Sequence, residues 1–229
     1  MVGEYCHDRW HCGDGDTLSE IRCQARSRKG LMILRYTFKE RIVHWVAAFA
    51  YVYLLLTGLA FYTPKLYWLA VVLGGGTTSR EWHPWAGLVF VAATVLMYVM
   101  WASDMRITEG DRAWGRAIGH YVRNEDKHLP PVGRYNAGQK YLFWLMFLGG
   151  VLLLISGVAM WFTSSIPWSL RWLRHWAVLV HVSAALATIG GFIIHVYMGT
   201  AVVRGGFTSI VRGEVSEEWA RTHHPLWKR

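Results

Sequence analysis

The sequence predicts an all-α integral membrane protein, a four-helix bundle with both termini in the cytoplasm. The chain has 229 residues, 53% of them hydrophobic, and its mean hydropathy of +0.21 is too high for a soluble domain. Its apolar residues fall into four blocks, each near or above the ~20 residues that span a bilayer. Lys and Arg gather on one side of these blocks, which sets the orientation.

The four blocks are expected to form one membrane domain, residues 32–229. They are residues 42–62, 84–102, 141–162 and 176–203. Residues 1–31 differ from this domain, because they hold all three cysteines and no apolar signal-peptide core. The cysteine spacings lack the paired C-x-x-C form of zinc sites. We expect a disordered N-terminal extension without a structural disulfide.

The positive charges predict the orientation. An even number of spans places both termini and the 103–140 loop on one side of the membrane, and these segments hold 20 of the 24 Lys and Arg residues. The opposite loops hold only Lys65, Arg80, Arg171 and Arg174. By the positive-inside rule both termini are cytoplasmic. The net charge of +9 therefore needs no nucleic-acid partner.

Histidines stand at the boundaries of the first two spans. His44 lies about one turn inside the cytoplasmic end of the first span. The following loop, residues 63–82, contains a short apolar stretch that predicts an interfacial helix, ended by a glycine turn at residues 74–76. Pro84 suits the first turn of the second helix, which puts His83 at the outer boundary. His83 is then either a ligand or a plain helix cap.

The fourth span carries His181 and His195 fourteen residues apart. In a helix this spacing brings both within ~40° of one face and ~21 Å apart along the axis. The residues between them are almost all small, which leaves room for a flat group such as haem. The alternative is that the small residues pack helix on helix and that the histidines only hydrogen-bond.

Topology pairs the four histidines. Spans one and three run outward and spans two and four run inward, so His44 and His195 share the cytoplasmic half while His83 and His181 share the outer half. Two neutral imidazoles suit the axial positions of a haem iron, whereas structural zinc requires four ligands. A haem-free histidine relay in a proton or solute carrier is the alternative from another class. We interpret the remaining histidines as solvated: His120, His128, His175, His223 and His224.

A glycine-rich, amide-bearing turn precedes the third span on the side of His44 and His195. It contains Asn136, Gly138 and Gln139. Such a turn can simply cap the helix, but it is of interest because it lies at the membrane level of the two cytoplasmic-half histidines. The same loop holds five acidic residues that either are simply solvated or deliver protons, which are Asp104, Glu109, Asp111, Glu125 and Asp126.

The order of these motifs resembles the gamma subunit of membrane-bound formate dehydrogenase over roughly residues 34 to 227. The matching segments are His44-Trp45, His83-Pro84, the run from Gly133-Arg134-Tyr135-Asn136 to Gly138-Gln139-Lys140, His181, His195-Val196-Tyr197-Met198 and the tail with His223-His224-Pro225. The N-terminal extension departs from the family pattern.

The resemblance implies a cytochrome b with two haem b groups, held by the same two histidine pairs. It further implies electron transfer from an iron–sulfur beta subunit, fed by a molybdenum- or tungsten-containing catalytic alpha subunit, to menaquinone or ubiquinone in a pocket lined by Asn136 and Gly138. Gln139 of the same turn is a further candidate for the quinone site. Formate chemistry then takes place on the partner. A cytochrome b subunit of a membrane-bound hydrogenase shares this architecture and is the nearer alternative. The electron donor is expected to bind the outer face, where exposed tryptophans offer contact area for a partner. The alternative is that these tryptophans only form an aromatic belt in the membrane.

Overall fold

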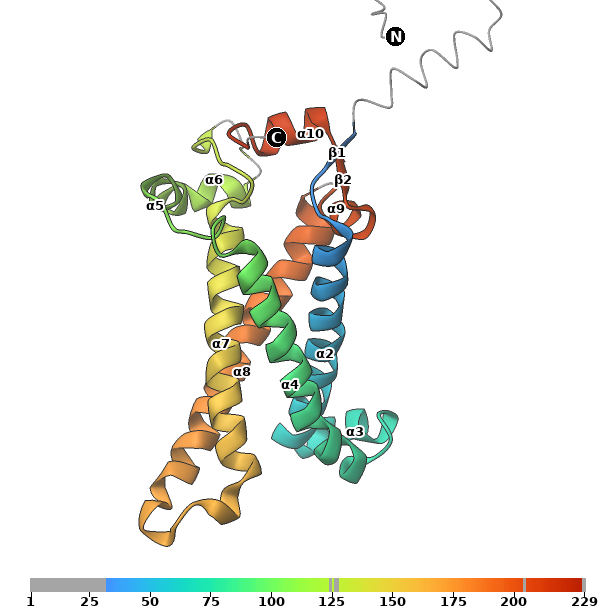
Figure 1. Ribbon diagram of the computed structural model, residues 1–229, viewed down its shortest axis with the longest axis vertical. Coiled ribbons are helices and arrows are strands. Elements are labelled where there is room, and N and C mark those ends of the chain that lie inside the picture. Colours follow the sequence, from blue (N-terminus) through green and yellow to red (C-terminus); the bar gives the residue numbers. More distant parts are fainter. Residues whose placement is uncertain (1–31, 124, 126–127, 204, 228–229) are drawn as a thin grey trace, which may run out of the picture.

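Four long helices form the body of the protein in this computed structural model, which describes residues 32–123, 125, 128–203 and 205–227 (Figure 1). The helices are α2 (Phe38–Tyr62), α4 (Gly76–Trp101), α7 (Ala137–Trp161) and α8 (Trp172–Tyr197). Each is long and apolar enough to cross a membrane. The predicted four-helix membrane bundle is confirmed. The predicted N-terminal extension, with Cys6, Cys12 and Cys23, lies outside the described residues.

Two of the helices begin earlier than their apolar blocks because polar caps extend them. Thr37 Oγ1 accepts a hydrogen bond from the Glu40 backbone N–H at 3.3 Å, and Glu40 accepts one from the Thr37 backbone N–H at 2.7 Å. This capping box starts α2 at Phe38. Asn136 and Gln139 form the same reciprocal arrangement at the start of α7.

Helix α4 begins eight residues before the predicted start. Gly74 and Gly75 have φ values of 96° and 98°, which glycine adopts without a Cβ penalty, and they turn the chain from α3 (Trp68–Val72) into α4. Pro84 therefore lies inside the helix, not in its first turn. His83 lies inside the helix too, so its interpretation as a helix cap is wrong.

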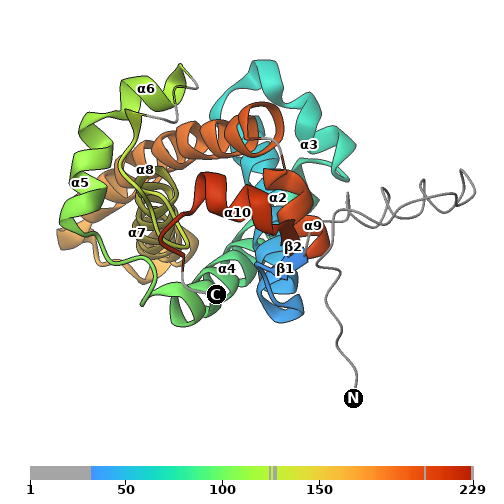
Figure 2. The same ribbon diagram turned by 90° about the horizontal axis from the view of Figure 1, so that it is seen from above.

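The bundle consists of two helix pairs joined side by side. Helix α2 packs on α4, α7 packs on α8, and α4 packs on α7. At mid-height the Tyr51 ring of α2 contacts the rings of Phe90 and Phe192, with centroids 5.4 and 5.1 Å apart. Figure 2 looks down the bundle and shows α10 (Glu217–His223) lying across its end.

The shorter elements gather at the two ends of the bundle (Figure 1). Both described termini lie at one end, where β1 (Met32–Leu34) pairs antiparallel with β2 (Glu214–Ser216). That end also carries α5 (Glu109–Arg116), α6 (Ile118–Val122) and α9 (Gly206–Arg212), while α8 runs on into a π-helical turn, Met198–Val202. The opposite end carries α3 and short 3₁₀ turns at Pro64–Leu66, Thr163–Ser165 and Trp168–Leu170.

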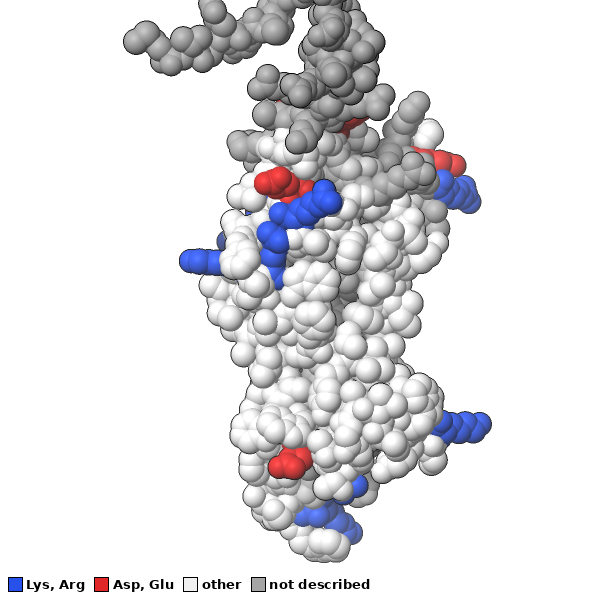
Figure 3. All heavy atoms as spheres, turned by 90° about the vertical axis from the view of Figure 1, so that its right-hand side faces the viewer, with Lys and Arg blue, Asp and Glu red and all other residues white. Residues whose placement is uncertain are grey.

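The sides of the bundle are apolar. Large hydrophobic side chains are exposed along every long helix, among them Phe49, Val99, Ile155 and Ile193. Figure 3 shows Lys, Arg, Asp and Glu near the two ends of the molecule, with a band free of them between. Side chains of this kind lower their free energy by facing lipid, so the bundle is that of a membrane protein.

Candidate haem sites

The structure brings the four predicted histidines together in the two predicted pairs. His44, in the second turn of α2, and His195, near the end of α8, lie at the end of the bundle that carries both described termini. We call them the near pair; their ring centroids are 6.1 Å apart. His83 of α4 and His181 of α8 form the far pair, with ring centroids 6.4 Å apart.

Both separations fit one metal ion between two imidazoles. With metal–nitrogen bonds of ~2.0–2.1 Å and a ring nitrogen ~1.1 Å from its own centroid, two axial rings have centroids ~6.3 Å apart. The ring planes are inclined by 57° in the near pair and 54° in the far pair, which axial ligands reach by rotating about their metal–nitrogen bonds. In each pair α8 supplies one ring, and α2 (near pair) or α4 (far pair) supplies the other. Among the described elements, α8 packs closely against α7 but not against α2 or α4.

Each histidine of the far pair contacts a hydroxyl on a neighbouring helix. His83 Nδ1 lies 2.7 Å from Thr57 Oγ1 of α2, and His181 Nδ1 lies 2.9 Å from Ser156 Oγ of α7. Sequence reasoning missed both hydroxyls. The signal is a hydroxyl residue followed by glycine in the first and third spans, at Thr57-Gly58 and Ser156-Gly157.

The glycines beside these hydroxyls lie close to the same rings. A Cβ on Gly157 would lie 3.3 Å from His181 Cε1, tighter than most real contacts, while a Cβ on Gly58 would lie 3.8 Å from His83 Cε1. The far pair is thus bounded on α7 by a position that only glycine fills without displacing the ring.

The near pair has a different environment. His44 Nδ1 is buried and has no hydrogen-bond partner, and no hydrogen bond of the His195 ring is found among the described residues. The Trp45 ring meets His44 edge-on at 5.6 Å and itself contacts Phe207 of α9 at 6.3 Å. An unpartnered imidazole nitrogen is costly in an apolar interior, so a group that uses the ring fits this position.

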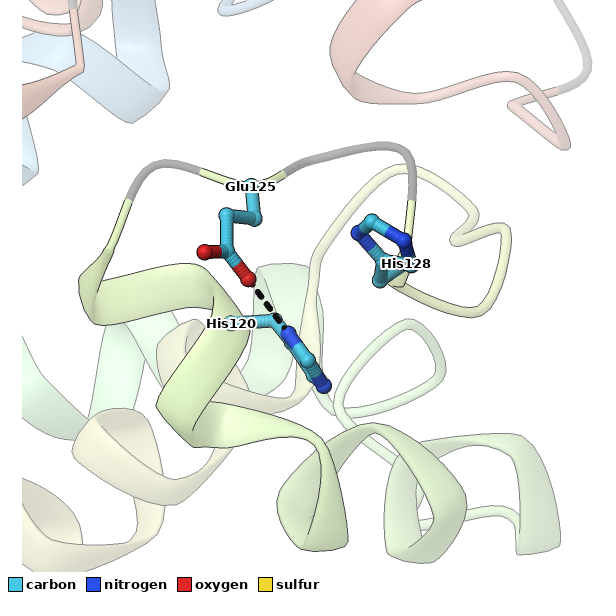
Figure 4. A group of neighbouring side chains, drawn as sticks. All are labelled: His120, Glu125 and His128. Atoms are coloured by element: carbon cyan, nitrogen blue, oxygen red, sulfur yellow. Dashed lines mark hydrogen bonds and ion pairs between the residues drawn. The ribbon is translucent and has the colours of Figure 1, made fainter.

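A structural zinc site does not fit either pair. The only group of three metal-binding side chains in the described part of the chain is His120, Glu125 and His128, away from both pairs. Figure 4 shows Glu125 and His128, from the loop after α6, beside His120. His120 Nδ1 lies 2.6 Å from the Glu125 carboxylate, and all three side chains are partly or fully exposed. The interpretation of His120 as merely solvated is therefore incomplete, since its ring is hydrogen-bonded to the Glu125 carboxylate.

The small residues of the long helices do not all have the same surroundings. A Cβ on Gly149 of α7 would lie 2.4 Å from Thr188 Cγ2, and one on Gly191 would lie 2.7 Å from Leu145 Cδ2. These positions pack α7 against α8, as the alternative interpretation held. Gly190 of α8 and Gly87 of α4, by contrast, have no atom within 4 Å of an added Cβ, so neither position is filled by helix packing.

The turn that was predicted to bind quinone is a helix cap. Asn136 Oδ1 accepts the Gln139 backbone N–H at 2.9 Å, and Gln139 Oε1 accepts the Asn136 N–H at 3.0 Å. Both bonds use side-chain oxygens, so the two amide nitrogens have no partner among the described residues. An added Cβ on Gly138 would lie 3.4 Å from the ring of Trp114 of α5. The three residues do not line the cavity of about 510 Å³ found at this end, which borders Glu40 and Arg134.

A buried polar network ties this turn to the helix of the near pair. Arg134, two residues before Asn136, donates to the carboxylates of Glu40 at 2.8 Å and Asp104 at 2.9 Å. Trp101 Nε1 also donates to Glu40, at 2.5 Å. Because Glu40 stands one helical turn before His44 in α2, the network fixes the turn relative to the near pair.

The C-terminal tail enters the same network, which corrects a prediction. His224 was expected to be solvated, but it is only 3% exposed. Its Nδ1 donates to the Gly133 carbonyl at 2.7 Å, and its Nε2 accepts from Arg35 at 3.2 Å. Burial and the adjacent Arg35 guanidinium lower the pKa of His224 to about 3. The ring is therefore neutral at physiological pH and anchors the tail.

The comparisons with known proteins agree with this geometry. The prokaryotic cytochrome b561 family matches residues 35–212, which include all four histidines. The chain is 37% identical over 198 residues to the formate dehydrogenase cytochrome b556(fdo) subunit of Escherichia coli K12, covering 86% of this chain and 92% of that protein.

Two further relatives are formate dehydrogenase subunits as well. The nitrate-inducible cytochrome b556(Fdn) subunit of Escherichia coli K12 is 30% identical over 201 residues, covering 88% of this chain and 92% of the relative. The cytochrome b556 subunit of Haemophilus influenzae is 35% identical over 200 residues, covering 86% and 82%. With four membrane helices and a family match over most of its length, the chain belongs to the prokaryotic cytochrome b561 family and is a membrane cytochrome b.

Proposed function

We propose that this chain is the membrane cytochrome b subunit of a formate dehydrogenase complex and carries electrons from an iron–sulfur subunit to quinone. The observation that carries the proposal is the presence of two histidine pairs, one toward each end of a membrane bundle, each spaced for one metal ion. His44 with His195 and His83 with His181 then hold two haem b groups.

The chain contributes ligands, spacing and insulation. When bound, haem b supplies a one-electron redox couple at each level. The four histidines would hold the haem iron through neutral imidazole nitrogens. The apolar flanks of the four helices keep both levels inside the hydrocarbon region, so electrons that arrive at the far pair cross the membrane to the near pair within one chain.

The electron donor is proposed to dock at the far end. Tryptophans of α3, α4, the connection between α7 and α8, and the start of α8 are exposed there; they are Trp68, Trp82, Trp168 and Trp172. Rigid aromatic side chains of this kind are enriched at protein interfaces. The proposed donor is an iron–sulfur beta subunit, which receives electrons from a molybdenum- or tungsten-containing alpha subunit that oxidises formate to carbon dioxide.

Quinone reduction is proposed at the turn before α7. This turn and both termini are proposed to lie on the cytoplasmic side of the inner membrane. The unpaired amide N–H groups of Asn136 and Gln139 are donors for a quinone carbonyl. Two electrons and two protons convert the quinone to a quinol. Because the electrons come from outside and the protons from the cytoplasm, the reaction separates charge across the membrane. Each charge moved across stores ~2.3 kcal/mol per 100 mV of membrane potential. Of the carboxylates predicted to deliver protons, Asp104 and Asp111 are held in ion pairs, while Glu109 is exposed.

The test uses the intact complex. Its subunits are identified by mass spectrometry, formate is added, and the reduction of haem b and its reoxidation by a quinone are followed optically. Formate should reduce the haem and quinone should reoxidise it. A complex without a formate-oxidising partner, or haem that formate leaves oxidised, would overturn the assignment.

Two variants separate the quinone from the cap. Asn136→Ser keeps a capping oxygen but lacks the amide N–H, whereas Asn136→Ala loses both. We expect at least tenfold slower reoxidation in both variants, with thermal stability lowered only in Asn136→Ala, by about 1 kcal/mol. Wild-type reoxidation in Asn136→Ser would show that Asn136 is a cap and nothing more.

The alternatives fit less well. A haem-free histidine relay conflicts with membership of a cytochrome b family. A hydrogenase subunit shares the fold, but the relatives compared above are formate dehydrogenase subunits.

A further inference from the structure

The two histidine pairs differ in what the Nδ1 atoms of their rings contact. In the far pair both Nδ1 atoms lie within hydrogen-bond distance of a hydroxyl, at 2.7 Å for Thr57 and 2.9 Å for Ser156. In the near pair His44 Nδ1 is buried without a partner in the described part of the chain. Thr57 and Ser156 are 0% and 4% exposed, so water does not replace either contact.

The direction of these hydrogen bonds follows from a second contact of each hydroxyl. Thr57 Oγ1 lies 2.8 Å from the Tyr53 carbonyl oxygen, and Ser156 Oγ lies 2.6 Å from the Leu152 carbonyl oxygen. A carbonyl only accepts, so each hydroxyl gives it its single proton. The hydroxyl oxygen is then left to accept, and the histidine donates its Nδ1–H.

This arrangement fixes the tautomer of both rings. With the proton on Nδ1, the lone pair of each ring is on Nε2, where a metal ion can use it. A hydrogen bond from the second nitrogen of a ligating histidine also increases the electron donation of the ring. Greater donation stabilises the oxidised more than the reduced iron and so lowers the reduction potential.

We propose that Thr57 and Ser156 are positioning residues that make the haem at the far pair the lower-potential one of the two. The proposal rests on the function proposed above, in which both pairs hold haem b. The near pair, whose rings have no such acceptor among the described residues, holds the higher-potential haem. Electrons delivered at the far end then move downhill toward the end that carries the Asn136 turn.

The test is a potentiometric titration of haem b absorbance in the purified complex. The component that is missing in His83→Ala identifies the far haem. Thr57→Val and Ser156→Ala each remove one acceptor while keeping the side chain compact. Each variant should lower the oxidised-to-reduced ratio of the far haem three- to tenfold at fixed potential. This corresponds to a rise of its reduction potential by ~28–59 mV for a one-electron couple. The near component should stay in place.

Two further variants separate hydrogen bonding from packing. Thr57→Ser keeps the hydroxyl and should restore the wild-type potential. Thr94→Val removes an equally buried hydroxyl of α4 that bonds only the Phe90 carbonyl of its own helix, at 2.8 Å, and should shift neither component.

The outcomes distinguish this proposal from the one on which it rests. Fewer than two haems in the wild-type complex would overturn the proposed function. Two haems, with unchanged far potentials in both Thr57→Val and Ser156→Ala, would overturn the role of the hydroxyls alone. A shift of the near component, or an equal shift in Thr94→Val, would contradict it as well. If one variant loses the far haem, the other still decides the matter.

Discussion

Lys140 and Asp111 form a buried ion pair that fastens α5 to the first turn of α7. Their side-chain atoms Nζ and Oδ2 are 2.8 Å apart, and Lys140 also donates to the Arg106 carbonyl at 3.0 Å. The residues are 8% and 5% exposed. Burial raises the pKa of the Asp111 carboxyl, but hydrogen bonds from Lys140 and Thr108 outweigh it and leave the pKa below its usual value. The carboxylate is therefore ionised at neutral pH.

Lys140→Met removes the charge and keeps the apolar stem of the side chain. Asp111 is then a buried carboxylate with hydrogen bonds only from Thr108, at 2.8 Å each. Removing one partner of a buried pair costs about 3–5 kcal/mol. At about 2–4 °C per kcal/mol for a protein of this size, Tm should fall by about 6–20 °C.

Thermal unfolding in detergent, followed by circular dichroism, measures this effect. The double variant Lys140→Met/Asp111→Asn removes both charges and should recover at least half of the loss, because no buried charge is left unpaired. Arg221→Met is the control: its ion pair with Glu217 is exposed on one helix, and exposed pairs of this kind are worth only about 0.3–0.5 kcal/mol. A Tm of Lys140→Met within ~2 °C of wild type, or a double variant no better than the single one, would refute the reasoning.

Two more predictions concern helix packing and pH. Gly149→Ala should destabilise the bundle by about 1–3 kcal/mol, because the new Cβ lies 2.4 Å from Thr188 Cγ2. Adding Thr188→Ser removes that methyl group and should restore Tm. Gly150→Ala is the control and should leave Tm unchanged, because the atom nearest to its new Cβ is 3.4 Å away. His224 has its pKa lowered from 6.5 to about 3 in the folded chain, so the unfolded chain takes up the proton first and stability falls with pH below 6.5. The fall is about 2 kcal/mol from pH 6.5 to 5, and Tm measured across this range should decline less in His224→Gln; an equal decline in both proteins would contradict the assignment.

Hydropathy and topology were enough to predict the membrane core of the protein. Spans are set by bilayer thickness, and an even number of them places His44 opposite His195 and His83 opposite His181 without knowledge of any contact. The helix ends were less well predicted. Capping at Thr37 is a local polar effect that a hydropathy window does not detect. The glycines before α4 let the helix begin far ahead of its apolar block.

Contacts between residues far apart in the chain could not be predicted from the sequence. His224 appeared solvated because it lies in a polar tail, yet it is buried against Arg35 and Gly133, 189 and 91 residues away. The hydroxyls at Thr57 and Ser156 were missed for the same reason, since nothing in either span alone shows which ring they face. Only their shared pattern, a hydroxyl followed by glycine, marks them in the sequence.

The measurement that tests the central claim most directly is the number of haem groups per chain. Pyridine haemochrome absorbance, divided by the protein concentration from amino-acid analysis, should give two haem b groups in wild type, extractable by acid acetone because the chain has no C-x-x-C-H attachment motif. His44→Ala and His83→Ala should each retain one, whereas His120→Ala, the matched control outside both pairs, should retain two. A wild-type ratio of one or zero, or a loss of haem in His120→Ala alone, would contradict the assignment of two histidine-ligated haems.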